Sequence, residues 1–169
     1  MKNFIRSSTC LMVLAFLIIS CSEEKIETPV QNPNQYQIDL NLSLETDWEM
    51  ADRVLMMVNQ HRTLQGLTEL AGDRQYASAY AVQHTKYMIA TNSLNHTNFD
   101  TRAAALKSRG STLVGETIAS GYKTADEVVA AWLNSEGHKQ VLEGNYTRAG
   151  FGVLKNSSDV YYYTMLVHK

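Results

Sequence analysis

Residues 147–167, TRAGFGVLKNSSDVYYYTMLV, contain two short runs that are rich in Val, Tyr, Phe and Thr. The first run covers 147–154, the second covers 160–167, and the polar segment 155–159 separates them. Residues of these types favour strands, and a polar segment between two such runs favours a turn. The sequence therefore predicts a β-hairpin at the end of the chain, preceded by segments with a different periodicity.

Helices are predicted upstream of the hairpin, from about residue 46. Apolar residues recur there at steps of three and four, which is typical of helices with one buried face. Each predicted helix starts at a residue whose side chain can accept a hydrogen bond from a free backbone N–H. These residues are Thr46, Asp73, Asp100 and Thr124. A glutamate follows Thr46 and Thr124 three residues later, so each pair is expected to form a capping box.

The remaining elements are short. A strand is predicted near 113–118, and a last helical turn near 139–142. About four helices followed by about three strands favour an α+β domain, with helices packed on both sides of a small antiparallel sheet. A chain of 169 residues is long enough for one such domain.

Composition and charge exclude few functions. The chain is 44% hydrophobic and 19% charged, which is the range of globular proteins. Its formal net charge of −2 offers no basic surface, so nucleic acid is not an expected partner.

The first residues have the pattern of an export signal. Lys2 and Arg6 precede the apolar run 11–19, which is too short to cross a membrane as a helix but suits a signal peptide. Ser20 and Cys21 follow directly, and the ending resembles a lipobox, where the signal is cut before a lipidated cysteine. We therefore expect a lipoprotein signal peptide at 1–20 and lipidation of Cys21.

The expected organisation after the signal is a tether and one domain. Residues 21–45 hold both prolines and many polar side chains, so we expect a flexible tether there and the domain at 46–169. The other cysteine, Cys10, lies within the signal, so no disulfide is expected in the domain. The expected location is the cell envelope, anchored to the outer membrane. Glu23 and Glu24 resemble an acidic signal for surface display, which stays an open alternative.

Two histidines and one glutamate stand out as candidate site residues. His96 and His138 lie in predicted loops or turns, where binding groups concentrate. Glu116 lies in the otherwise apolar predicted strand, where a carboxylate is costly to bury unless it is paired. By contrast, His61 is expected to be solvated beside Arg62.

The order of several motifs resembles the CAP superfamily (cysteine-rich secretory proteins, antigen 5 and pathogenesis-related 1), in its bacterial SCP-like branch. The matching segments are Val58–Arg62, Asn95-His96, Gly115–Ala119, Ala131–His138 and Ala149–Val153. The resemblance implies an α-β-α sandwich of three layers. It also implies a cleft that contains two histidines and, in many members, two glutamates.

Carried over to this chain, the resemblance places His96, Glu116 and His138 in the cleft. The position of the second family glutamate is Ser135, and the adjacent Glu136 completes the set only if it turns toward the cleft. Thr117 also replaces the family's usual asparagine after the glutamate.

The expected function is that of a binding module, with an unidentified divalent metal, lipid, small-molecule or protein ligand. No cofactor is required, although imidazoles are zinc ligands and weak binding of zinc or another divalent metal through His96 and His138 is expected. The alternative is a metal-dependent hydrolase that uses Glu116 as base, or a nucleophilic Ser135 activated by His138. No catalytic residue is assigned, because the resemblance favours a protein without enzymatic activity.

Overall fold

The computed structural model describes residues 36–169; the predicted signal peptide, Cys21 and the first part of the predicted tether lie outside them. The elements in chain order are η1 (Leu40–Glu45), α1 (Trp48–Leu64), β1 (Ala71–Gly72), α2 (Tyr76–Thr91), α3 (Phe99–Lys107), β2 (Val114–Ser120), α4 (Ala125–Leu133), α5 (Glu136–Leu142), β3 (Arg148–Lys155) and β4 (Tyr161–His168).

The predicted hairpin forms the centre of a four-stranded sheet with the order β1-β3-β4-β2. Strands β3 and β4 pair antiparallel, with Phe151 opposite Met165, and β2 pairs antiparallel with the other side of β4. The antiparallel prediction is confirmed for these three strands. The two-residue strand β1 was not predicted; it pairs parallel with β3, so the complete sheet is mixed.

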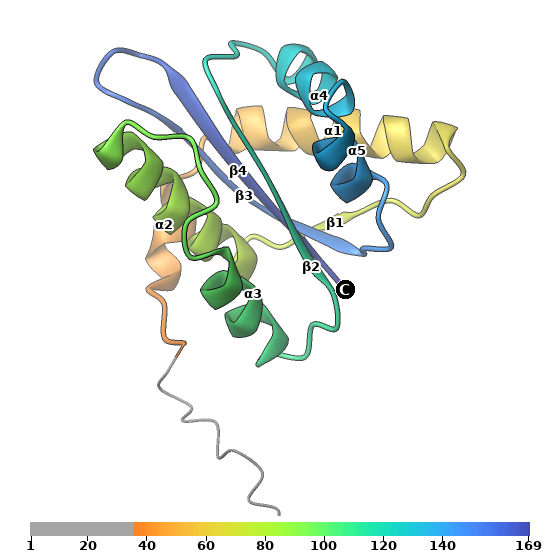
Figure 1. Cartoon of the computed structure of the whole chain (residues 1–169), viewed down its shortest axis with the longest axis horizontal. Coiled ribbons are helices and arrows are strands. Elements are labelled where there is room, and N and C mark those ends of the chain that lie inside the picture. Colours follow the sequence, from red (N-terminus) through yellow and green to blue (C-terminus); the bar gives the residue numbers. More distant parts are fainter. Residues whose placement is uncertain (1–35) are drawn as a thin grey trace, which may run out of the picture. The chain divides into compact units, whose positions relative to one another are not determined.

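Helices cover both faces of the sheet, as Figure 1 shows, and the predicted α-β-α sandwich is confirmed. Helices α1 and α4 bury Val54, Val58 and Trp132 against one face, together with Phe151 and Met165 of the hairpin. On the other face, α2 and α3 pack around Leu166 of β4. Because β2 is an edge strand, the two helical layers can meet beyond its free side.

Helix α2 lies unusually close to β3, and two glycines permit it. A Cβ atom built on Gly150 would lie 2.4 Å from the backbone of Ala77, and one on Gly152 would lie 2.4 Å from the backbone of Ala81. Both distances are shorter than any van der Waals contact. The glycines on the strand and the alanines on the helix therefore set the separation of these two layers.

Three of the four predicted helix starts need correction. Asp47, rather than Thr46, caps α1 by accepting a hydrogen bond from the N–H of Met50, while the Thr46 hydroxyl donates to the carbonyl of Phe151. The Asp73 carboxylate lies two residues before the cap position of α2. Helix α3 already begins at Phe99, before Asp100. The predicted capping box of Thr124 and Glu127 is present in α4.

The predicted tether is too long at its C-terminal end. Residues 40–45 form the 3₁₀ helix η1, and the indole of Trp48 donates to the carbonyl of Ser43. Tyr36 and Ile38 pack against the cluster between α2, α3 and the sheet. The folded part of the chain therefore includes residues 36–45, which the polar composition of this segment did not indicate.

The close packing of α2 on β3 predicts a large difference between two glycine substitutions. We expect Gly152→Ala to lower the free energy of unfolding by about 1–3 kcal/mol, because its new methyl group would overlap the helix backbone. Gly137→Ala is the control: no atom lies within 4 Å of its Cβ position in α5, and alanine favours a helix over glycine. Urea denaturation measures both values, and an equal effect of the two substitutions would contradict the packing.

Candidate functional site

Glu116 is buried in β2, and an arginine from the neighbouring layer neutralises it. Its side chain is 1% exposed. The guanidinium of Arg102, on α3, donates from Nε to Oε2 at 2.7 Å and from Nη2 to Oε1 at 2.8 Å. The third nitrogen, Nη1, donates to the carbonyl of Thr97 at 2.7 Å. The ion pair therefore links β2, α3 and the loop before α3.

His96 lies in that loop and completes the contacts of the carboxylate. Its Nδ1 is 2.8 Å from Oε1 of Glu116, and its side chain is 48% exposed. An ionised carboxylate can only accept, so Nδ1 carries the proton in this hydrogen bond. The other ring nitrogen, Nε2, is consequently the one that is left to contact a ligand.

The second predicted histidine comes from the opposite helical layer. His138 lies on α5, and its ring centroid is 6.4 Å from that of His96, with the two rings tilted by 49°. Helix α5 packs next to the edge strand β2, which explains how residues from the two layers meet. Residues separated by 42 positions in the sequence thus lie next to each other.

Ser135 and Glu136 lie differently. Ser135 and His138 line a cavity of about 240 Å³ whose walls are mostly apolar, including Leu94, Ile118 and Trp132. Glu136 is exposed, and its carboxylate accepts a hydrogen bond from Gln140 one turn later. Ser135 therefore adjoins the cleft, while Glu136 is turned away from it and does not take the place of a second cleft glutamate in this structure.

The electrostatics of the cleft favour a charged Glu116 and a neutral His138. Burial alone would raise the pKa of Glu116, but the hydrogen bonds from His96 and Arg102 hold this pKa below its ordinary value. Burial, together with the nearby His96, lowers the pKa of His138. The ring of His138 is therefore neutral at pH 7 and can accept a hydrogen bond or bind a metal.

Sequence reasoning missed two residues of the site. One is His84, which is buried; its Nε2 donates to the carbonyl of Asn95 at 2.7 Å and lies 3.9 Å from Oε1 of Glu116. Burial is the largest cause that lowers the pKa of His84. Arg102 was not singled out at all. The sequence offered one signal for Arg102. Burying the charged Glu116 is costly unless a cation on a neighbouring element pairs with it.

His61 and Arg62 are not on a solvated face, contrary to the prediction. His61 is partly buried and lies 2.9 Å from the carboxylate of Glu143. Arg62 is 1% exposed, and its guanidinium donates to four backbone carbonyls, those of Thr68, Leu142, Gly144 and Tyr146. These contacts hold the segment before β3 and lie outside the cleft.

The described residues of the cleft provide two imidazole ligands for a metal and no third ligand. Both oxygens of Glu116 already accept hydrogen bonds, and the adjacent guanidinium repels a cation. Among residues 36–169, no cluster of three or more His, Cys, Asp or Glu side chains is arranged to hold a metal ion. The residues present therefore suit a weak two-histidine site and do not suit a tightly held catalytic zinc.

The comparisons with known proteins agree with the fold and with the family resemblance. The model of the cysteine-rich secretory protein (CAP) family matches residues 55–167. The uncharacterized protein YkwD of Bacillus subtilis is 35% identical over 111 residues, and the uncharacterized membrane protein YlbC of the same organism is 34% identical over 119 residues. These alignments cover 63% and 66% of this chain, but only 43% and 32% of the two relatives.

Solved structures show the same architecture. An extracellular protein of Bacillus anthracis with an SCP domain is 27% identical with a TM-score of 0.60, over 73% of this chain and 44% of that chain. An outer surface protein of Borrelia burgdorferi is 23% identical with a TM-score of 0.64, over 72% of this chain and 92% of that one. At 23% identity, the second likeness bears on the fold alone.

The buried ion pair predicts a strong effect of Arg102→Met. We expect this substitution to lower the free energy of unfolding by about 3–5 kcal/mol at pH 7, because Glu116 remains buried without its guanidinium. The loss should be smaller near pH 4. Without Arg102 the pKa of Glu116 rises, so the variant takes up a proton on folding as the pH falls and recovers part of its stability.

The control is Arg53→Met, which removes an exposed ion pair with Glu49 one turn away on α1. We expect a change of less than about 1 kcal/mol there. Urea denaturation at the two pH values measures both variants. An Arg102→Met variant as stable as Arg53→Met would show that the ion pair does not hold the site together.

Proposed function

Because the chain belongs to the cysteine-rich secretory protein (CAP) family, we propose that it is an exported, lipid-anchored binding module whose ligand contacts His96 and His138. The observation that carries this proposal is the convergence of the two rings, 6.4 Å apart, beside the buried Glu116. Imidazoles from opposite helical layers meet at the surface, where a ligand can reach both of them.

Glu116 acts in this proposal by positioning His96. A carboxylate that accepts the Nδ1–H of a histidine fixes the ring and makes Nε2 the electron-rich nitrogen. Arg102 holds the carboxylate in turn through two hydrogen bonds. The cleft thus presents a preoriented imidazole to the ligand, with His138 opposite.

The cavity next to His138 suggests the character of the ligand. Its walls include Leu94, Ile118, Ala119 and Trp132, and its volume of about 240 Å³ suits a small apolar group rather than a whole drug-sized molecule. A ligand with one polar end at the imidazoles and a short apolar part in the cavity fits this arrangement best.

A metal-dependent hydrolase in the same cleft has less support. A general base needs an oxygen that can reach water and a pKa near the working pH. Both oxygens of Glu116 accept hydrogen bonds, and its pKa lies below the ordinary value. No hydrogen bond links the Ser135 hydroxyl to His138 among the described residues, which leaves Ser135 without an activating base.

Zinc is a suitable probe of the two imidazoles. We expect calorimetry on the full chain to show weak binding that disappears when His96 and His138 are both replaced by alanine. His61→Ala is the matched control, because His61 binds Glu143 outside the cleft, and it should leave the heat unchanged. Affinity should fall as the pH drops, because protons compete for the ring nitrogens. A binding isotherm that survives in the double variant would reject the proposed cleft.

The location follows from different observations. One structural relative is an extracellular protein with an SCP domain, and one sequence relative is named as a membrane protein. No helix within residues 36–169 is both long and apolar enough to cross a membrane. The proposed attachment is the lipid on Cys21, which supplies more than one acyl chain and would suffice for stable anchoring.

Replacing the proposed acylation site tests the anchor. Cys21→Ser should leave the protein unprocessed or release it from the membrane fraction, because the thioether cannot form. Cys10→Ser, within the same predicted signal, is the control and should remain in the membrane fraction. Processing and fractionation of Cys21→Ser that both match the parent chain would refute lipid attachment at Cys21.

A further inference from the structure

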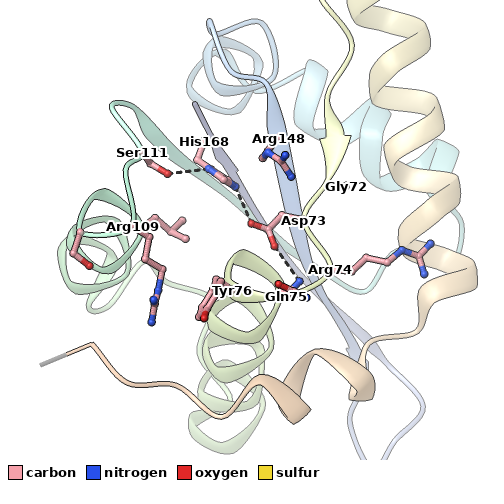
Figure 2. Close-up of a pocket in the computed structure, with 11 residues that line it drawn as sticks. Gly72, Asp73, Arg74, Gln75, Tyr76, Arg109, Ser111, Arg148 and His168 are labelled. Carbon is pink, nitrogen blue, oxygen red and sulfur yellow. Dashed lines mark hydrogen bonds and ion pairs between the residues drawn. The ribbon is translucent and has the colours of Figure 1, made fainter. Parts of the chain in front are cut away.

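A second, larger cavity lies away from the cleft, where the C-terminal end of β4 meets the start of β3 (Figure 2). Its volume is about 600 Å³, which is within the usual range of small-molecule sites. Segment 72–76 before α2, the end of α3 and Ser111 form the rest of its wall. None of these residues belongs to the cleft of His96 and His138.

A chain of three polar side chains runs through the cavity. The Ser111 hydroxyl lies 2.9 Å from Nδ1 of His168, and Nε2 of His168 lies 3.1 Å from the carboxylate of Asp73. Burial raises the pKa of Asp73, but the hydrogen bonds from His168 and from the backbone N–H groups of Gln75 and Ala77 bring this pKa below its ordinary value. The ionised Asp73 is thereby satisfied by protein donors.

Two arginines flank this chain in Figure 2. Arg148, the first residue of β3, has an exposed guanidinium that makes no hydrogen bond or ion pair with any described residue. Arg109 stacks on the ring of Tyr76 at 3.8 Å and donates to the carbonyl of Tyr36 at 3.2 Å. The third arginine, Arg74, reaches away from the cavity and pairs with Asp52 on α1.

The charges of the cavity do not cancel. Asp73 is the single carboxylate among the described lining residues, and Arg148 and Arg109 have no carboxylate partner among the described residues. A guanidinium presents a planar fork of donors that matches the two oxygens of a carboxylate or a phosphate. The unpartnered fork of Arg148 therefore requires an oxyanion or water, and the cavity provides room for a molecule.

We propose that this cavity binds a small molecule through a phosphate or carboxylate group, with Arg148 as the principal contact. Arg109 contributes the second positive charge and, stacked on Tyr76, a flat wall. The hydroxyl of Ser111 faces the same space and can bond the part of the ligand next to the anion. This site is separate from the function proposed for the cleft and does not depend on it.

The order Ser111, His168, Asp73 resembles a nucleophile with its base, but its surroundings favour binding. An oxyanion hole needs free N–H groups near the nucleophile. The N–H of Ser111 donates to the carbonyl of Leu106 at 3.2 Å, and the N–H of Thr112 donates to the carbonyl of Lys169 at 2.6 Å. Both N–H groups already donate to protein carbonyls, so neither is free for an oxyanion. We therefore assign Ser111, His168 and Asp73 a structural role in the cavity wall.

The test is calorimetric titration of the full chain at low ionic strength with three probes: inorganic phosphate, phenyl phosphate and benzoate. We expect saturable binding of at least one probe, and a loss of about tenfold in affinity with Arg148→Met, which removes a charge-assisted, bidentate contact. The guanidinium of Arg148 makes no hydrogen bond or ion pair with any described residue, so this variant should keep the melting temperature of the parent. Preference for phosphate or for benzoate identifies the anion.

Two controls separate this site from the rest of the molecule. Arg53→Met removes an exposed arginine of α1 outside the cavity and should bind the probes as the parent does. The double alanine variant of His96 and His138 should also bind them unchanged, so a failure of the cleft proposal would leave this result intact. No saturable binding of any probe, or equal affinity in Arg148→Met, would overturn the assignment.

Discussion

Glu116 and Arg102 form the interaction on which the cleft depends. The carboxylate projects from β2 into the layer of α2 and α3, where it is almost completely buried, and the guanidinium meets it with two hydrogen bonds. A buried ion pair adds little net stability over an apolar pair of the same shape, but it is costly to break. Its effect here is geometric: it fixes α3, the loop that carries His96 and the edge strand β2 in one arrangement.

The rest of the cleft follows from the topology around that pair. Strand β2 is the edge of the sheet, and α5 passes next to it, so His138 can approach His96 from the opposite layer. On the face of the sheet that α2 and α3 cover, the glycines of β3 let α2 pack at close range. The same helix begins beside the cavity of Arg148 and carries His84 next to the cleft, so it adjoins both proposed binding regions.

Patterns that are local in the sequence were predictable. The hairpin, the strand that contains Glu116 and the capping box of Thr124 each depend on neighbouring residues, and the structure has all three. The motif order also identified the family and placed His96, Glu116 and His138 together. The starts of the other helices were wrong by a few residues, because several side chains near each start can accept a backbone hydrogen bond and packing decides which one does.

Features that depend on contacts distant in the sequence were missed. In the sequence, Arg62 looks like a surface residue of a helix. In the structure it is buried, and its guanidinium donates to backbone carbonyls of Thr68 and of segment 142–146. Arg102 gives no local sign that it will meet Glu116, and the cavity of Arg148 requires the two ends of the hairpin to be placed next to α2. Only the tertiary structure brings these groups together.

The charge state of Glu116 tests this account most directly. Site-specific carbon NMR of its carboxyl group, followed through an acid titration of the folded protein, measures the pKa. The contacts with His96 and Arg102 predict a pKa below the ordinary value of a glutamate, so the carboxyl should remain ionised to lower pH than exposed glutamates do. A pKa above the ordinary value would mean that burial outweighs these contacts, and that the ion pair which arranges the cleft does not form.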